Sequence, residues 1–224
     1  MRLAMSADPL DLVLFDLDGT LVDSLPDIAA ALNHALMTHG FTALTTETIA
    51  TLVGDGIVSL SERALALQPD NLGVTAETLS HSVGQRYLEN PCVLTKPYDG
   101  ILETLGALKA RGVPMAVVTN KPGNIARPLL DALGMSSWFI AIIGDGDGFA
   151  RKPAPDALTS LMARVNAQPE RTLMVGDGIP DVAVAKAAGC IPVAALWGYT
   201  PRAVLLSLEP RNALMAPQQI LNLP

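Results

Sequence analysis

Short apolar segments that alternate with helical patterns are the feature that most constrains the fold of this chain. Most of the five segments are rich in Val and Ile and end near Asp, Asn or Gly: 10–15, 113–118, 139–143, 172–175 and 191–196. Such runs are typical of strands buried on both faces of a parallel sheet. Helical patterns precede or separate the last four segments, at 100–110, 124–133, 155–165 and 180–188. The alternation predicts an α/β fold with a doubly wound parallel sheet.

The stretch from about residue 24 to residue 96 departs from this alternation. It contains helical patterns at 26–39, 57–67 and 75–88 but no convincing buried strand. We therefore predict an inserted helical domain at residues 24–96, with residues 1–23 and 97–224 forming the sheet domain. Joints near 23–25 and 95–98 would let the helical insertion (residues 24–96) move against the sheet.

Composition narrows the classes of partner. Half of the 224 residues are apolar and the net charge is −7, without a block of like charge. A chain of this kind can bury a large core, and it lacks the basic patch that a nucleic-acid partner would attract. An anionic substrate would have to be captured by local cations. Oligomeric state is left open between monomer and homodimer.

Cellular location is predicted from what the sequence contains. The first nine residues hold one Arg and no apolar run, so we predict no signal peptide there. No stretch approaches the ~18 apolar residues that a membrane span needs. The two cysteines, Cys92 and Cys190, fit no metal-ligand spacing and suit a reducing compartment. We therefore expect a soluble cytoplasmic protein without a membrane partner.

Two carboxylates, Asp16 and Asp18, follow the first apolar segment directly. In open parallel sheets, ligands bind beyond the carboxyl ends of the strands. One carboxylate there can act as a nucleophile towards phosphorus, and a second can protonate the leaving oxygen and then activate water. Gly19 would let the backbone approach a phosphate closely. An ordinary Asp-Gly turn is the alternative for this segment alone.

Three further polar groups follow later predicted strands. The hydroxyl of Thr119 and the amide of Asn120 could donate to phosphate oxygens, and Lys152 could neutralise both phosphate and carboxylate. Asp177 and Asp181 offer hard oxygen ligands of the kind that Mg²⁺ takes. Each group alone also fits a turn or a solvated residue. Together they fall at the ends of different strands of one sheet, which indicates a shared site.

The order of these four groups resembles that of the haloacid dehalogenase superfamily. Its four motifs match Asp16–Thr20, Thr119, Lys152, and Asp177 with Asp181. The resemblance spans essentially the whole chain and implies a Rossmann-like core whose helical insertion is a type-1 cap.

The resemblance also implies a mechanism. Asp16 would form an aspartyl phosphate, and Asp18 would act as general acid and then general base. Mg²⁺ would be held by Asp16, the backbone carbonyl of Asp18, Asp177 and, directly or through water, Asp181. Thr119, Asn120 and Lys152 would hold the phosphoryl group, and the expected substrate contacts extend to Gly19, Thr20, Lys121, Gly54 and Arg63. One departure is Gly178, where these phosphatases commonly carry Ser or Thr.

Within the superfamily the chain resembles the phosphoglycolate phosphatase group. The resemblance rests on segments 23–27, 53–56 with 62–65, and 118–122. It implies that Arg63 pairs with a substrate carboxylate such as that of 2-phosphoglycolate; an exposed helical residue beside Glu62 is the equal alternative. A phosphatase for a sugar or amino-sugar phosphate, a phosphosugar mutase, and a non-catalytic binding protein remain as alternatives. Trp197 and Tyr199 either line the entrance or pack.

Overall fold

The computed structural model describes residues 10–70 and 72–223. Its centre is a six-stranded sheet in the order β5-β4-β1-β6-β7-β8, in which every pairing is parallel. The strands are β1 (Leu12–Phe15), β4 (Met115–Pro122), β5 (Ala141–Asp145), β6 (Thr172–Gly176), β7 (Ile191–Ala195) and β8 (Asn212–Leu214). The first nine residues, for which the sequence predicts no signal peptide, lie outside the described residues.

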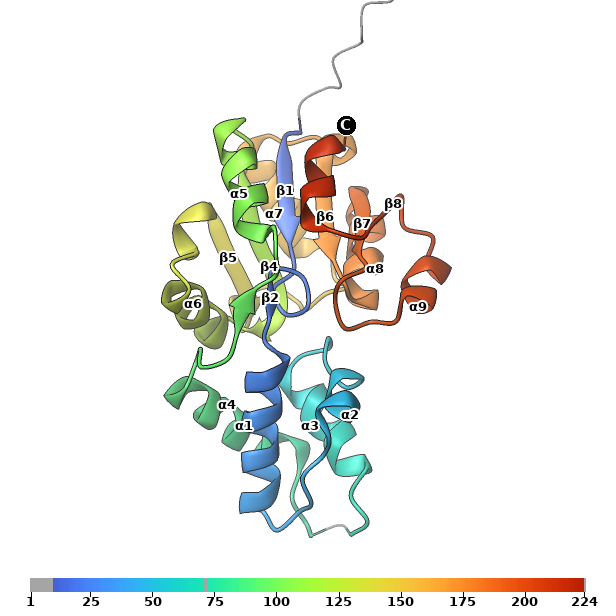
Figure 1. Cartoon of the computed structure of the whole chain (residues 1–224). Helices are drawn as coiled ribbons and strands as arrows, with labels where there is room; N and C mark the ends of the chain where they lie inside the picture. Colours follow the sequence, from blue (N-terminus) through green and yellow to red (C-terminus); the bar gives the residue numbers. More distant parts are fainter. Residues whose placement is uncertain (1–9, 71, 224) are drawn as a thin grey trace, which may run out of the picture.

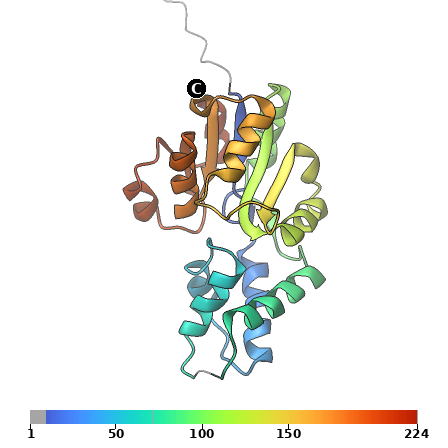
Figure 2. The same cartoon turned by 180° about the vertical axis from the view of Figure 1, so that it is seen from behind.

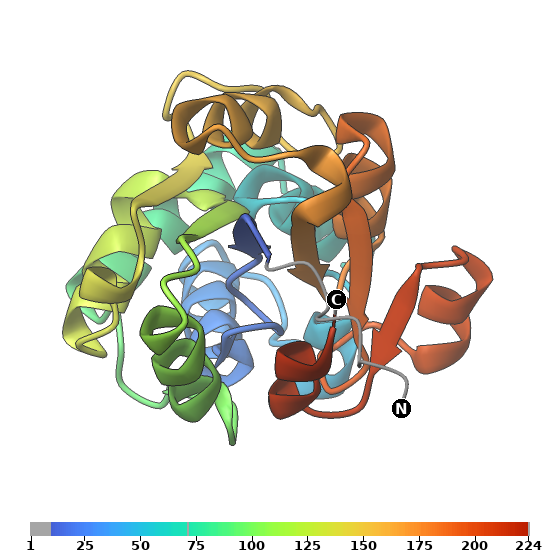
Figure 3. The same cartoon turned by 90° about the horizontal axis from the view of Figure 1, so that it is seen from above.

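Helices cover both faces of this sheet. Along β1, Val13 and Phe15 join one hydrophobic cluster and Leu12 and Leu14 join another. The first cluster includes buried residues of α5 (Ile101–Ala110) and α6 (Gly123–Ala132), and the second those of α7 (Asp156–Val165) and α8 (Ile179–Ala188). Figures 2 and 3 show the two helical layers from behind and from above. The predicted doubly wound parallel sheet is therefore confirmed.

The helical insertion packs at the carboxyl ends of the strands (Figure 1). It holds α1 (Leu25–Thr38), α2 (Thr46–Ala50), α3 (Ile57–Ala66) and α4 (Ala76–Glu89), of which α2 was not predicted. A two-stranded antiparallel sheet joins the two connections to the sheet domain, pairing β2 (Val22–Asp23) with β3 (Lys96–Pro97). The insertion therefore enters and leaves the sheet domain at one place, next to the end of β1.

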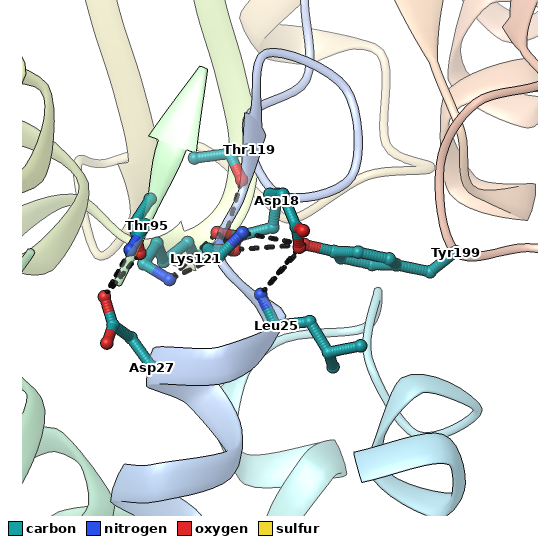
Figure 4. Close-up of polar contacts among 9 residues, drawn as sticks. Asp18, Leu25, Asp27, Thr95, Thr119, Lys121 and Tyr199 are labelled. Atoms are coloured by element: carbon teal, nitrogen blue, oxygen red, sulfur yellow. Dashed lines mark hydrogen bonds and ion pairs between the residues drawn. The ribbon is translucent and has the colours of Figure 1, made fainter. Parts of the chain in front are cut away.

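Asp27, in the first turn of α1, fastens the second of these connections. Its carboxylate accepts hydrogen bonds of 2.6–3.0 Å from the Thr95 hydroxyl and from the backbone N–H groups of Val93, Leu94 and Thr95. Burial opposes ionisation of this carboxyl, but the hydrogen bonds outweigh burial and hold its pKa below the usual value. Figure 4 shows Asp27 and Thr95 facing each other across the junction.

The C-terminal part adds small elements that the sequence did not predict. They are β8, α9 (Arg202–Ser207) and a 3₁₀ helix at Pro217–Asn222, which packs beside α5. None of the helices among the described residues combines the length and apolarity needed to cross a bilayer.

Candidate active site

Three carboxylates from different segments meet beyond the ends of β1 and β6. One oxygen of each of Asp16, Asp177 and Asp181 lies within 4.8 Å of the others. Asp16 is the residue after β1, Asp177 follows β6, and Asp181 lies in the first turn of α8. Because β1 and β6 are parallel neighbours, their carboxyl ends coincide and bring these side chains together.

Lys152 places a buried positive charge against this group. Its Nζ donates to Asp16 Oδ1 at 2.8 Å and to Asp181 Oδ1 at 2.6 Å, and its side chain is 3% exposed. Burial alone would lower the pKa of Lys152, but the negative charges of Asp16 and Asp181 outweigh burial and raise it. The lysine therefore stays charged and can offset the repulsion between a carboxylate nucleophile and an anionic phosphate.

Asp177 has no cation beside it among the described residues of this cluster. Its two oxygens accept hydrogen bonds from the Thr20 hydroxyl at 3.1 Å and from the Tyr199 backbone N–H at 2.8 Å. Burial, followed by the negative charges of Asp16 and Asp181, raises its pKa to about 8. Three close carboxylates with one lysine leave excess negative charge, which fits a hard divalent cation such as Mg²⁺.

Two glycines let the backbone close around Asp177. Gly19 has a φ of +81°, and a Cβ there would lie 2.3 Å from Asp177 Oδ2. A Cβ on Gly198 would lie 2.3 Å from Asp177 Cβ. Thr20 also accepts a hydrogen bond from the Asp177 N–H at 3.0 Å. In this structure Gly19 and Thr20 therefore shape the carboxylate cluster, and their substrate contacts stay a prediction.

The side chain of Asp18 points to a different set of partners. Its carboxylate accepts hydrogen bonds from Ser24 Oγ at 2.5 Å and from Lys121 Nζ at 3.0 and 3.1 Å. Burial is the largest single influence and would lower the pKa of Lys121, but the charge and hydrogen bonding of Asp18 together with Tyr87 outweigh it and raise that pKa. Figure 4 shows Lys121 reaching Asp18 from the end of β4. The Asp18 carboxyl is thus held beside the acidic cluster instead of within it, where it could exchange a proton with substrate.

A cavity of about 70 Å³ lies between the strand ends and the helical insertion. The sheet side contributes mostly polar and charged residues: Asp16, Asp18, Thr119, Asn120, Lys121, Asp177, Asp181, Tyr199 and Thr200, together with Pro122, Ile125 and Gly178. The insertion contributes Ile28, Val53, Gly54, Gly56, Ile57, Leu60, Val83 and Tyr87. One wall of the cavity is therefore polar and the other almost entirely apolar.

The comparisons with known proteins agree with this geometry. The sequence model of the haloacid dehalogenase-like hydrolase family matches residues 13–195. This chain belongs to the haloacid dehalogenase-like hydrolases. The predicted family is therefore confirmed.

Relatives and solved structures extend this result over nearly the whole chain. A phosphoglycolate phosphatase of Aquifex aeolicus is 38% identical, with 94% of this chain and 95% of the relative covered. That of Escherichia coli K12 is 36% identical, covering 84% and 81%. A solved structure from Haemophilus somnus, described as a predicted phosphoglycolate phosphatase, superposes with a TM-score of 0.87 at 33% identity, covering 95% and 97%. The fold of this hydrolase is thus that of its relatives, insertion included.

Thr119 and Asn120 occupy the end of β4 in this haloacid dehalogenase-like hydrolase, as expected. Thr119 Oγ1 accepts the Lys121 backbone N–H at 3.2 Å. The Asn120 amide donates to the carbonyls of Gly54 and Lys152, both at 3.2 Å, and its oxygen accepts the Lys152 N–H at 2.9 Å. Asn120 therefore links the insertion loop to the lysine segment, and its contact with phosphate stays a prediction.

Arg63 does not reach the cavity. Its guanidinium pairs with Asp55 and donates to the Leu52 carbonyl at 3.2 Å, and its side chain is 43% exposed. Gly54, in contrast, lines the cavity. In this hydrolase the Asp55 carboxylate occupies the position at Arg63 that a substrate carboxylate was expected to take.

Tyr199 is the site residue whose role was left open. Its hydroxyl accepts backbone N–H groups of Ser24 at 2.8 Å and Leu25 at 3.0 Å, and donates to Asp23 at 3.2 Å. Nearby, Trp197 donates from Nε1 to the Thr20 carbonyl at 3.0 Å. The segment after β7 therefore joins Asp177 to the first connection of the insertion. Two aromatic residues after a strand gave no sign of these partners, more than 170 residues away.

Proposed function

We propose that this phosphatase hydrolyses 2-phosphoglycolate to glycolate and phosphate through an aspartyl phosphate on Asp16, with Mg²⁺ as cofactor. The carrying observation is the convergence of Asp16, Lys152, Asp177 and Asp181 at one edge of the sheet. The names of the relatives, each a phosphoglycolate phosphatase, support the choice of substrate.

The proposed reaction has two steps on this chain's own residues. In the first, a carboxylate oxygen of Asp16 forms a bond to phosphorus while the ester P–O bond breaks, and Asp18 gives a proton to the leaving oxygen. In the second, Asp18 takes a proton from water, the water oxygen attacks phosphorus, and the Asp16–phosphorus bond breaks. Lys152 remains charged throughout and offsets the negative charge of the transferring group.

The metal would be held by Asp16, Asp177, the Asp18 carbonyl and, directly or through water, Asp181. When bound, it supplies positive charge that neutralises phosphate and carboxylates together. Asp181 is paired with Lys152 at 2.6 Å, and burial raises its pKa to about 6 while Lys152 opposes that rise.

The cavity supports a short leaving group over a sugar. We infer that the helical insertion acts as a cap over the bound ester, and among the described residues its wall offers one polar side chain, Tyr87. A sugar phosphate would bury several hydroxyls against this wall without partners, and unpaired buried polar groups are costly. Lys121, at the opposite wall, is a cation suited to a carboxylate.

The direct test is phosphate release from a panel of phosphorylated metabolites, with and without Mg²⁺ and without any bisphosphate. We expect 2-phosphoglycolate to have the highest kcat/KM and turnover to require the metal. A sugar phosphate at the head of the panel would contradict the substrate, and dependence on an activating bisphosphate would indicate a mutase.

Covalent catalysis is tested with Asp16→Asn. The amide is a far poorer nucleophile, so we expect turnover to fall by at least ~10⁴-fold while the protein stays folded. Asp156→Asn, at an exposed carboxylate in the first turn of α7, is the matched control and should keep wild-type turnover. Retained turnover in Asp16→Asn would refute the aspartyl phosphate.

A further inference from the structure

Tyr87 carries a hydroxyl that the fold of this chain leaves unused. The residue lies in α4, is 4% exposed and lines the cavity. Its hydroxyl is buried and makes no hydrogen bond of good geometry with the described residues, although the Lys121 ammonium lies close enough to influence its pKa. A buried hydroxyl without a partner is unfavourable, and native proteins keep few of them. Phe would fill the same space without this cost. We therefore expect the bound ligand to supply the hydrogen-bond partner of the hydroxyl.

Lys121 lies directly against this tyrosine. Its Nζ is 4.2 Å from the centroid of the Tyr87 ring, and the same ammonium holds the carboxylate of Asp18. Lys121 is the one cation among the described residues that line the cavity. The pair thus joins the sheet wall and the insertion wall beside the residue expected to protonate the leaving oxygen.

We propose that the Tyr87 hydroxyl and the Lys121 ammonium together bind the carboxylate of the leaving group, so that Tyr87 selects phosphate esters of short hydroxycarboxylic acids. The inference rests on the proposed phosphatase function and names its substrate class. A carboxylate accepts hydrogen bonds from both groups, and its charge matches Lys121. Burial, the largest influence, raises the pKa of Tyr87, which keeps its hydroxyl protonated as a donor.

The position of the pair limits the length of the substrate. Lys121 contacts Asp18, whose proton goes to the ester oxygen, so a carboxylate at Lys121 must lie close to that oxygen. A leaving group of two or three carbons meets this condition. The remaining insertion side chains at the cavity are aliphatic and offer a longer polar chain nothing to bind: Ile28, Val53, Ile57, Leu60 and Val83.

The test compares two substrates on Tyr87→Phe. Values of kcat/KM are measured with Mg²⁺ for 2-phosphoglycolate and for ethyl phosphate, in which a methyl group replaces the carboxylate. We expect the ratio of the two values to fall by roughly 10- to 100-fold in the variant, because a hydrogen bond to a charged group is lost. The Ki of glycolate as a competitive inhibitor should rise by a similar factor, which reports binding without chemistry.

Tyr98→Phe is the matched control. Tyr98 neighbours Tyr199 but does not line the cavity, so loss of its hydroxyl should affect both substrates alike and leave their ratio unchanged. Thermal unfolding of metal-free Tyr87→Phe should occur at or above the wild-type temperature, since the hydroxyl makes no hydrogen bond of good geometry with the described residues of the free protein. A marked loss of stability would contradict that premise.

The remaining outcomes separate this inference from the proposed function. An unchanged ratio in Tyr87→Phe, or an equal fall for both substrates, would overturn the role of Tyr87. Wild-type enzyme that hydrolyses ethyl phosphate as well as 2-phosphoglycolate would instead contradict the proposed substrate. A preference for 2-phosphoglycolate over ethyl phosphate that is present in the wild type and lost in Tyr87→Phe would support both the proposed substrate and the role of Tyr87.

Discussion

The two walls of the cavity differ in the polarity of their side chains. The sheet wall carries buried charges that have named partners, as Asp16 and Asp181 are each paired with Lys152. The insertion wall is aliphatic except for Tyr87 and the loop glycines. Fixed charges in a site from which water is excluded act more strongly than they would in solvent. The difference supports the proposal that the sheet performs the chemistry, while the insertion excludes water and selects the substrate.

The walls meet at two connections, the first of which is tied to the site itself. Tyr199 receives the backbone N–H groups of Ser24 and Leu25 at its hydroxyl, and donates its own N–H to Asp177. Asp27 holds the other connection through Thr95. The position of the apolar wall is therefore set by contacts that begin at a predicted metal ligand.

Lys152→Met is the change that should damage the charged wall most. It keeps the length of the side chain but leaves Asp16 and Asp181 without their buried partner. Removing one partner of a buried ion pair typically costs about 3–5 kcal/mol of stability. Losing a cation at the transferring phosphoryl group should lower kcat by at least ~10³-fold. Steady-state kinetics and urea denaturation measure the two effects.

Lys186→Met is the matched control for that change. Lys186 is exposed in the last turn of α8, donates to the Leu208 carbonyl and pairs with none of the three clustered carboxylates. It should alter kcat by less than about twofold and stability by about 0.5 kcal/mol or less. A Lys152→Met enzyme with near wild-type kcat would show that the charged wall does not perform the chemistry.

The sheet wall was predictable because its signals are local. Apolar runs marked the five longer strands, and a parallel sheet brings polar residues at strand ends to one edge. Asp16, Lys152, Asp177 and Asp181 meet for that reason. β8, with only three residues at the edge of the sheet, has no apolar run to mark it.

The contacts of the insertion wall were less predictable because they depend on side-chain orientation and on residues distant in sequence. The helical position of Arg63 could be read from the sequence, but its pairing with Asp55 depends on the loop at 54–56. Tyr199 likewise finds Ser24 across 175 positions of sequence, a contact that no local pattern encodes. The catalytic roles could be predicted from the family resemblance, whereas these contacts could be seen only in the folded structure.

Asp177→Asn tests how much the repulsion among the clustered carboxylates destabilises the protein when no metal is bound. The pKa of Asp177 is raised from 3.8 to about 8, first by burial and then by Asp16 and Asp181. The folded protein thus binds this proton more tightly than the unfolded chain. The carboxyl contributes stability that is complete below about pH 4 and is lost as pH rises through about 8.

In EDTA, the wild-type free energy of unfolding should therefore fall between about pH 5 and about pH 8.5, and Asp177→Asn should remove part of that fall. Urea denaturation at the two pH values measures both. Mg²⁺ should restore stability to the wild type at the higher pH and do little for the variant. If the free energy of unfolding changed with pH in the same way in both proteins, the raised pKa of Asp177 would not be the cause of the fall.

Arg63→Ala should have the smallest effect. It tests whether the insertion wall contributes a cation that binds the substrate. Arg63 and Asp55 are 43% and 40% exposed, so their pair should contribute only about 0.2–1 kcal/mol. Because the guanidinium is paired with Asp55 and does not line the cavity, KM should change little and equally for 2-phosphoglycolate and ethyl phosphate. Kinetics on both substrates check this. A selective rise in KM for 2-phosphoglycolate would show that Arg63 leaves Asp55 to bind the substrate carboxylate, and the insertion wall would then be charged in the working enzyme.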